Sequence, residues 1–186
     1  MPKPVRRLVA GGPDEYFEVT CAVLADGVTS PADAALTALE HGFWANDTDR
    51  SEGDPWPDET QPHDYVRLLA EINVLIDHKE PKHQKAVNVL EEGIWEFKVA
   101  RKRFTFYDTM GDGTFTPKFK HEDRETAPYP ASDFWWFPTF DQQLRLGHVF
   151  GKEGHLAGRE NIESSKQVRE EDLAHDTQDN SALSDE

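Results

Sequence analysis

The sequence has a single cysteine, Cys21, among 186 residues. One thiol cannot form an intrachain disulfide, and it leaves no zinc site built from cysteine ligands. The histidines lack the spacing of a ligand set, and no glycine-rich phosphate loop or nucleophilic triad is present, so we predict no metal and no small-molecule cofactor. No apolar run approaches the length of a membrane span, and the only apolar run near the start is LVA. We therefore expect no membrane partner, no secretion signal and a reducing, cytoplasmic location.

Positive charge is also scarce, because 20 lysines and arginines face 36 aspartates and glutamates, for a formal net charge of −16. Such an acidic average argues against nonspecific nucleic-acid binding by the whole surface. The cations that exist are nevertheless concentrated. The segment GIWEFKVARKRFTFYD places four of them within residues 98–103. A local anion site on this segment is therefore compatible with the acidic remainder of the chain.

Apolar and polar residues alternate along this segment, which predicts an antiparallel hairpin. If Phe97 pairs with Phe104, one face of the hairpin is wholly apolar, and a one-residue slip would bury charges. The same register places Lys98 directly opposite Arg103 on the other face. Like charges in that position are unfavourable, unless water screens them or an anion lies between them. A solvated strand face is the plainer alternative to an anion site.

The flanking patterns predict the other elements. Residues 16–24 form a strand, Ser30 and Pro31 begin a helix that Gly42 ends, and residues 65–76 keep helical spacing. Residues 134–150 contain a further strand, in which Leu144, Leu146, His148 and Phe150 are expected to face the core while Gln143 and Arg145 face outward. We therefore expect an α+β fold with two N-terminal helices packed on a mainly antiparallel twisted sheet, followed by a short C-terminal helix.

The domain organisation follows from composition. We expect one domain over residues 15–174, with insertions at about 43–62 and 109–133 that are polar and rich in turn residues. Residues 1–14 should be a flexible N-terminus, and residues 175–186 an acidic disordered tail.

Three stretches carry a resemblance to a known family. GIWEFKVARKRFTFYD, LRLGHVFGKEG and GRENIESSKQVREEDL resemble the hairpin, the later strand and the closing helix of the RelE/ParE toxin superfamily, particularly its HigB-like branch. The resemblance covers roughly residues 15–173 and implies a RelE-like fold. It also implies a cytoplasmic toxin of a type II toxin–antitoxin pair, with a cognate antitoxin as partner. The RelE and HigB branches cut mRNA, usually on the ribosome, and so inhibit translation; the ParE branch poisons DNA gyrase.

The resemblance implies catalytic roles for Lys98, Arg103, Tyr107 and Lys152 in a metal-independent endoribonuclease. In such a reaction the 2′-hydroxyl attacks the adjacent phosphorus and yields a 2′,3′-cyclic phosphate, and positioned cations stabilise the added negative charge. A neighbouring arginine should lower the pKa of Lys98, so that Lys98 can act as a base. We further predict RNA contacts for the following side chains: Arg101, Lys102, Arg145 and His148.

Alternatives remain open at this point. The inward direction of His148 favours a core histidine. The aromatic run at residues 134–137 favours a core or loop-anchoring role over base stacking. Glu153 stands where a second basic residue is common in the family, and the whole chain is acidic. A noncatalytic protein-binding module on a toxin fold is therefore the alternative from another functional class, and gyrase poisoning is the alternative within the family.

Overall fold

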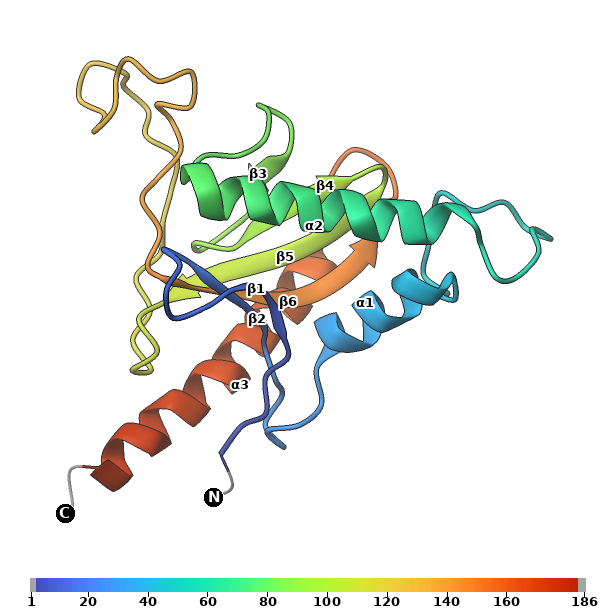
Figure 1. Ribbon diagram of the computed structural model, residues 1–186, viewed down its shortest axis with the longest axis horizontal. Helices are drawn as coiled ribbons and strands as arrows, with labels where there is room; N and C mark the ends of the chain where they lie inside the picture. Colours follow the sequence, from blue (N-terminus) through green and yellow to red (C-terminus); the bar gives the residue numbers. More distant parts are fainter. Residues whose placement is uncertain (1–2, 184–186) are drawn as a thin grey trace.

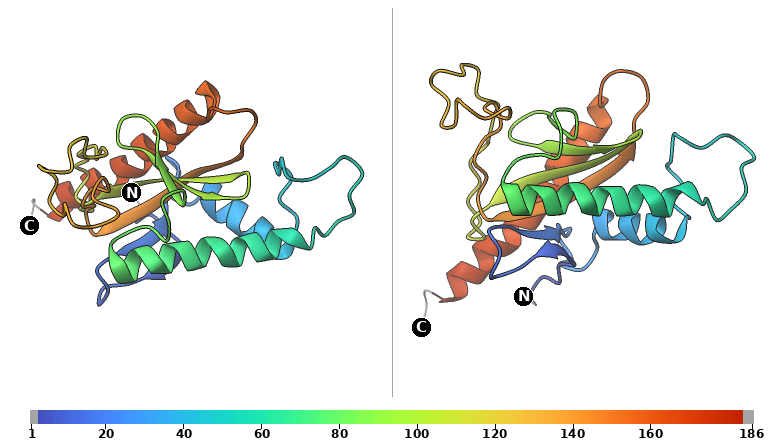
Figure 2. Two further views of the ribbon diagram at one scale, coloured as in Figure 1. Left: turned by 90° about the horizontal axis from the view of Figure 1, so that it is seen from above. Right: turned by 45° about the horizontal axis from the view of Figure 1, so that its top comes forward.

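A six-stranded mixed sheet organises the chain, which the computed structural model describes over residues 3–183 (Figure 1). Its order is β1-β2-β6-β5-β4-β3. The strands are β1 (Leu8–Gly11), β2 (Glu18–Cys21), β3 (Val87–Val89), β4 (Trp95–Val99), β5 (Lys102–Thr109) and β6 (Gln143–Gly151). The helices are α1 (Pro31–His41), α2 (Thr60–His78) and α3 (Arg159–Leu183). Seen from above, α1 and α2 lie on one side of the sheet and α3 on the other (Figure 2).

This arrangement shows that the predicted fold class is wrong. The sheet is mixed, because β2 pairs in parallel with β6, and the chain begins with the β1–β2 hairpin rather than with two helices on an antiparallel sheet. The last helix is also long, at 25 residues. The parallel pairing joins segments that α1, α2 and a whole hairpin separate along the chain, and no local pattern encodes such a contact.

Both ends of the described chain hold regular secondary structure. β1 lies within residues 1–14 and pairs with β2, where we expected a flexible N-terminus. α3 continues to Leu183, where we expected a disordered tail from residue 175. Residues 184–186 of that tail lie outside the described residues. Contacts with the sheet stabilise these segments despite their polar composition, as described below for α3.

The start and end of α1 follow the sequence prediction. The Ser30 side chain accepts a hydrogen bond from the backbone N–H of Asp33, and Pro31 occupies the first turn. Gly42 ends the helix with φ +81° and donates its N–H to Ala38. α2 covers the predicted 65–76 stripe, and Lys79 ends it in the left-handed region. These local signals act within one helical turn, which is why the sequence alone identifies them.

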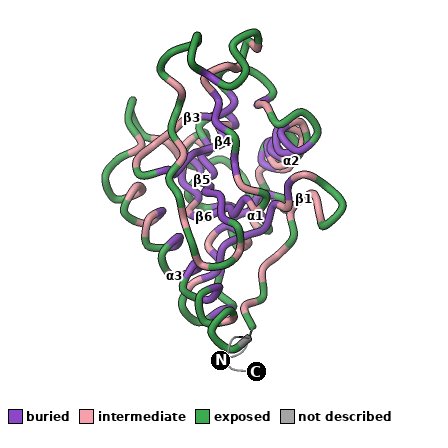
Figure 3. Tube along the Cα trace, turned by 90° about the vertical axis from the view of Figure 1, so that its left-hand side faces the viewer, coloured by how far each residue is buried: buried purple, intermediate pink, exposed green. Residues whose placement is uncertain are grey.

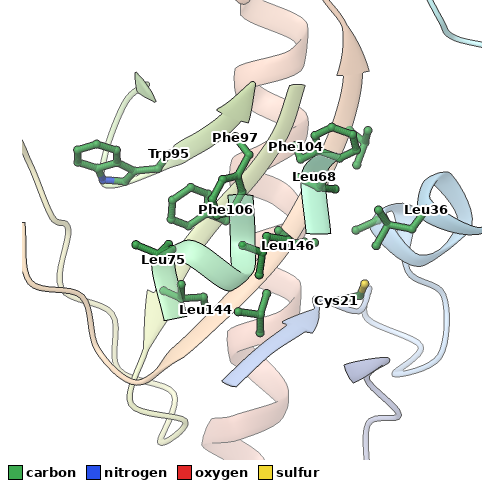
Figure 4. Packing of buried hydrophobic residues seen from close by; sticks show 14 of the residues in the cluster. Cys21, Leu36, Leu68, Leu75, Trp95, Phe97, Phe104, Phe106, Leu144 and Leu146 are labelled. Atoms are coloured by element: carbon green, nitrogen blue, oxygen red, sulfur yellow. The ribbon is translucent and has the colours of Figure 1, made fainter. Parts of the chain in front are cut away.

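The register of the β4–β5 hairpin is confirmed residue by residue. Phe97 pairs with Phe104, and Lys98 pairs with Arg103. The apolar face of this hairpin packs with α1 and α2 into one core (Figure 4). Within that core the rings of Phe97 and Phe106 stack at 4.4 Å between centroids. The aromatic run at 134–137 contributes Phe137 to the same core, in agreement with the structural alternative.

β6 does not keep a single alternation along its length. The β5–β6 register shifts between Phe104, opposite Val149, and Phe106, opposite Leu146, so β6 holds one extra residue there. Such a bulge reverses the side-chain alternation. Leu144, Leu146 and Val149 therefore belong to the α1–α2 core, whereas His148 and Phe150 stack on each other on the opposite face. For this reason neither His148 nor Phe150 joins the α1–α2 core as predicted, although Phe150 is still buried on the other face of the sheet.

Candidate functional site

The sheet face opposite α1 and α2 carries the Lys98–Arg103 pair of the β4–β5 hairpin. Lys98 is half-buried, and Arg103 is only 8% exposed. One terminal nitrogen of Arg103 donates to the carbonyls of Ala100 and Lys102, at 2.9 and 3.0 Å. Its Nε is buried and has no hydrogen-bond partner within the described residues. Part of the guanidinium therefore retains its capacity to bind an anion.

A buried carboxylate lies beside this guanidinium. Glu96 is 4% exposed, and its Oε1 lies 3.7 Å from Arg103 Nε, beyond hydrogen-bond distance. Asn88 donates to the same oxygen at 3.4 Å, whereas Oε2 is buried and has no hydrogen-bond partner among residues 3–183. Glu96 is not among the site residues predicted from the sequence. The alternation along β4 was the signal available, because it places Glu96 on the same face as Lys98.

The environment shifts the pKa values of these groups in opposite directions. Burial raises the pKa of the Glu96 carboxyl, although Arg103, Asn88 and Lys98 each lower it in part. Burial also lowers the pKa of the Lys98 ammonium, and the nearby Arg103 lowers it further. The direction for Lys98 agrees with the sequence expectation, but burial is a larger cause than the arginine. These shifts suit proton transfer, because the Glu96 carboxyl binds its proton more tightly and the Lys98 ammonium binds its proton less tightly than usual.

Glu96 lies in the wall of a groove of about 450 Å³. The groove runs between β3, the start of α3 and the loop over residues 152–158, and Lys152, His155 and Leu156 contribute to its lining. The backbone of Lys152 is fixed, because its N–H donates to Arg101 at 2.7 Å and its carbonyl accepts from Thr48 and Arg101. Its half-buried side chain makes no ion pair within residues 3–183. Lys152 therefore offers a free cation at the groove.

Lys102 is not in this site. It is 1% exposed and lies on the α2 side, where its ammonium contacts three carboxylates at 2.9–3.1 Å, from Asp47, Asp49 and Asp64. The predicted RNA contact of Lys102 is not supported by this position, because α2 and the 42–59 loop bury its ammonium and pair it with carboxylates. Arg101 is exposed, but its guanidinium donates to the Lys152 carbonyl.

Tyr107 and Arg145 lie beneath α3. The Tyr107 hydroxyl donates to Asp172 at 2.5 Å, and the Arg145 guanidinium contacts Asp172 and Asp176, each at 2.6 Å. Arg6 reaches the same two carboxylates from the N-terminal segment. These positions give no support to the predicted catalytic role of Tyr107 or the predicted RNA contact of Arg145, because both side chains are buried and already paired.

This ionic cluster also helps to attach α3 to the sheet. The apolar cluster beneath the helix is small, formed by Ala22, Tyr107, Val168 and Leu173. The burial pattern shows the sheet-facing side of α3 covered and its outer side exposed (Figure 3). Two arginines and two aspartates therefore hold a helix whose sequence is only weakly apolar.

His148 occupies a separate polar hollow of about 680 Å³ beside the start of α3. Its Nε2 lies 2.9 Å from Asn161 Oδ1, and Asn161 donates its own amide to the Ala157 carbonyl at 2.9 Å. Because an amide oxygen can only accept, His148 Nε2 is assigned as the donor of this hydrogen bond. His148 is therefore near the groove but holds the loop–helix junction.

No family model matches the chain, and no curated protein matches its sequence. Among residues 3–183, no helix combines the length and the apolar character needed to cross a membrane. In the same residues, no group of three or more histidine, cysteine, aspartate or glutamate side chains is arranged to hold a metal ion.

Proposed function

We propose that the chain is a toxin-type endoribonuclease that cuts mRNA through the groove at Glu96. The observation that carries the proposal is the pair of buried, unpartnered atoms at this place, Glu96 Oε2 and Arg103 Nε. Buried polar groups without partners are rare in folded proteins and call for an explanation such as catalysis. Two further cations, Lys98 and Lys152, lie close enough to shift the Glu96 pKa. The toxin assignment itself derives from the sequence resemblance.

The groups divide the reaction between them. The Glu96 carboxylate accepts the proton of the 2′-hydroxyl as that oxygen bonds to phosphorus. Arg103 and Lys152 stabilise the extra negative charge on the phosphoryl oxygens. Lys98, whose pKa is lowered, gives its proton to the departing 5′-oxygen. The products are a 2′,3′-cyclic phosphate and a free 5′-hydroxyl. Because Glu96 is 4% exposed and Arg103 is 8% exposed, RNA binding requires the groups that cover these two side chains to move.

The test is induced expression in bacteria, with growth and mRNA integrity followed together. The variants are Glu96→Gln and Lys98→Met, and the control is Lys85→Met, which removes one exposed charge outside the groove. We expect the native chain to arrest growth and to cleave mRNA. Glu96→Gln should slow the cleavage roughly 10²-fold or more, and the control should leave it unchanged. The cleaved ends should carry 2′,3′-cyclic phosphate by mass spectrometry. Arrest with intact mRNA and altered DNA supercoiling would favour gyrase poisoning instead.

A specific observation favours a second candidate, a noncatalytic protein-binding module. Lys102 and Arg145, two of the cations predicted to meet RNA, are neutralised inside the fold, and the net charge is −16. This candidate predicts no growth arrest at good soluble expression. It also predicts that partner binding changes little with salt, whereas phosphate binding weakens steeply as salt rises.

A further inference from the structure

A separate pocket of about 300 Å³ lies among the β1–β2 turn, the C-terminal end of α2 and the loop that precedes β6. Six aromatic side chains line it: Tyr16, Phe17, Tyr129, Phe134, Phe137 and Phe140. It shares no lining residue with the groove at Glu96. Its volume is at the small end of the range for ligand pockets, so it suits a compact ligand.

The walls of this aromatic pocket are fixed in place. Phe17, Phe137 and Phe140 are buried, and the rings of Phe137 and Phe140 meet edge to face at 5.1 Å between centroids. The loop over residues 129–140 is attached to the segment after α2 by side-chain hydrogen bonds. Ser132 donates to Glu80 at 2.5 Å, and Trp136 donates to Gln84 at 2.7 Å. A pocket formed in advance loses little entropy when it binds a ligand.

The electrostatics of the pocket favour a cation. Glu80 lines it and has no ion-pair partner within residues 3–183. α2 ends at His78 beside it, and the C-terminal end of a helix carries partial negative charge. Aromatic faces attract cations through their quadrupole. The net charge of −16 adds a long-range attraction for cations.

The chain already places an ammonium group on one of these rings. The Nζ of Lys79 lies 3.7 Å from the centroid of Tyr16. Lys79 is exposed and forms no salt bridge within the described part of the chain. Its ammonium therefore marks a cation position at the pocket and competes for it.

We propose that the aromatic pocket binds a small organic cation of the quaternary or methylated ammonium class. The rings surround the methyl groups, Glu80 supplies the countercharge, and the Lys79 ammonium is displaced from the Tyr16 face on binding. Quaternary ammonium groups suit such a site because they are charged, yet their methyl groups need no hydrogen bonds.

The probes are choline and 3,3-dimethyl-1-butanol, the neutral carbon isostere of choline, titrated against the full chain by calorimetry or NMR. We expect choline to bind in the millimolar range, roughly fivefold or more tightly than the isostere. Phe134→Leu and Glu80→Gln should each weaken choline binding. Lys79→Met should strengthen it, because the competing ammonium is removed. Phe119→Leu, which changes an exposed ring outside the pocket, should leave it unchanged.

Three outcomes would overturn the proposal. They are equal affinity for the neutral isostere, no binding of choline at tens of millimolar, or a loss of affinity in Lys79→Met. Circular dichroism of each variant checks that it is folded, and Glu80→Gln keeps the hydrogen-bond acceptor for Ser132, so that at least this variant should fold.

Discussion

Replacing Arg145 with methionine tests whether ionic contacts hold α3 on the sheet. The Arg145 side chain is 2% exposed and lies 2.6 Å from a carboxylate oxygen of both Asp172 and Asp176. Methionine preserves much of the apolar volume but leaves two buried carboxylates that, within residues 3–183, pair with no cation other than Arg6. Removing one partner of a buried ion pair costs about 3–5 kcal/mol. We expect the free energy of unfolding to fall by about that amount, measured by urea denaturation with circular dichroism.

The matched control is Arg159→Met on the same helix. Arg159 also contacts a carboxylate at 2.8 Å, from Glu91, but its side chain is 64% exposed. Exposed pairs of this kind contribute about 0–1 kcal/mol. An equal loss of stability in the two variants would show that burial does not increase the contribution of the ionic cluster, contrary to this prediction.

The cluster also predicts a response to acid. Burial alone would raise the pKa of Asp172, but the Arg145 and Arg6 guanidiniums bring it below its usual value. A carboxyl group with a lowered folded-state pKa contributes stability that is present above its unfolded pKa of about 3.9 and lost as pH falls through the folded pKa. In Arg145→Met this lowering is reduced, so acid unfolding should begin at a higher pH than in the wild type.

Three further predictions test other parts of the fold by the same denaturation assay. Burial raises the pKa of Glu71 to about 7. A raised carboxyl pKa stabilises the folded state when the pH is below the pKa of the unfolded chain, and this stabilisation is lost as the pH rises to about 7. Glu71→Gln should therefore match the wild type near pH 4.5 and exceed it at pH 8 by about 1–3 kcal/mol. Lys102→Met leaves three aspartates without their shared cation and should cost about 3–5 kcal/mol; a loss below about 1 kcal/mol would contradict its burial. Gly113→Ala places a methyl group against the backbone of Thr177 at φ +86°, whereas Gly154→Ala has a similar φ and open space. Both substitutions should lower the free energy of unfolding by about 1–2 kcal/mol through backbone strain. An ordered α3 beside Gly113 requires a larger loss of stability for Gly113→Ala than for Gly154→Ala.

Much of the fold near the hairpin could be predicted because its determinants are local. The pairing of Lys98 with Arg103 follows from alternation over a few residues, since any slip would bury charge. Ser30 and Gly42 act within single helical turns. The bulge in β6 could not be predicted in this way, because the alternation of apolar and polar residues along that strand does not indicate an extra residue. It moved His148 and Phe150 to the other face of the sheet.

The candidate site was predicted less well, because the reactivity of a cation depends on what covers it. Local alternation was enough to predict the hairpin, its register and the face that carries Lys98, Arg103 and the overlooked Glu96. Which of these charges remain available depends on the segments that pack over the sheet. α3 buries Tyr107 and Arg145, and α2 with the 42–59 loop buries Lys102. Burial and ion pairing join residues that lie far apart along the chain, whereas the alternation of apolar and polar residues reflects only neighbours in the sequence.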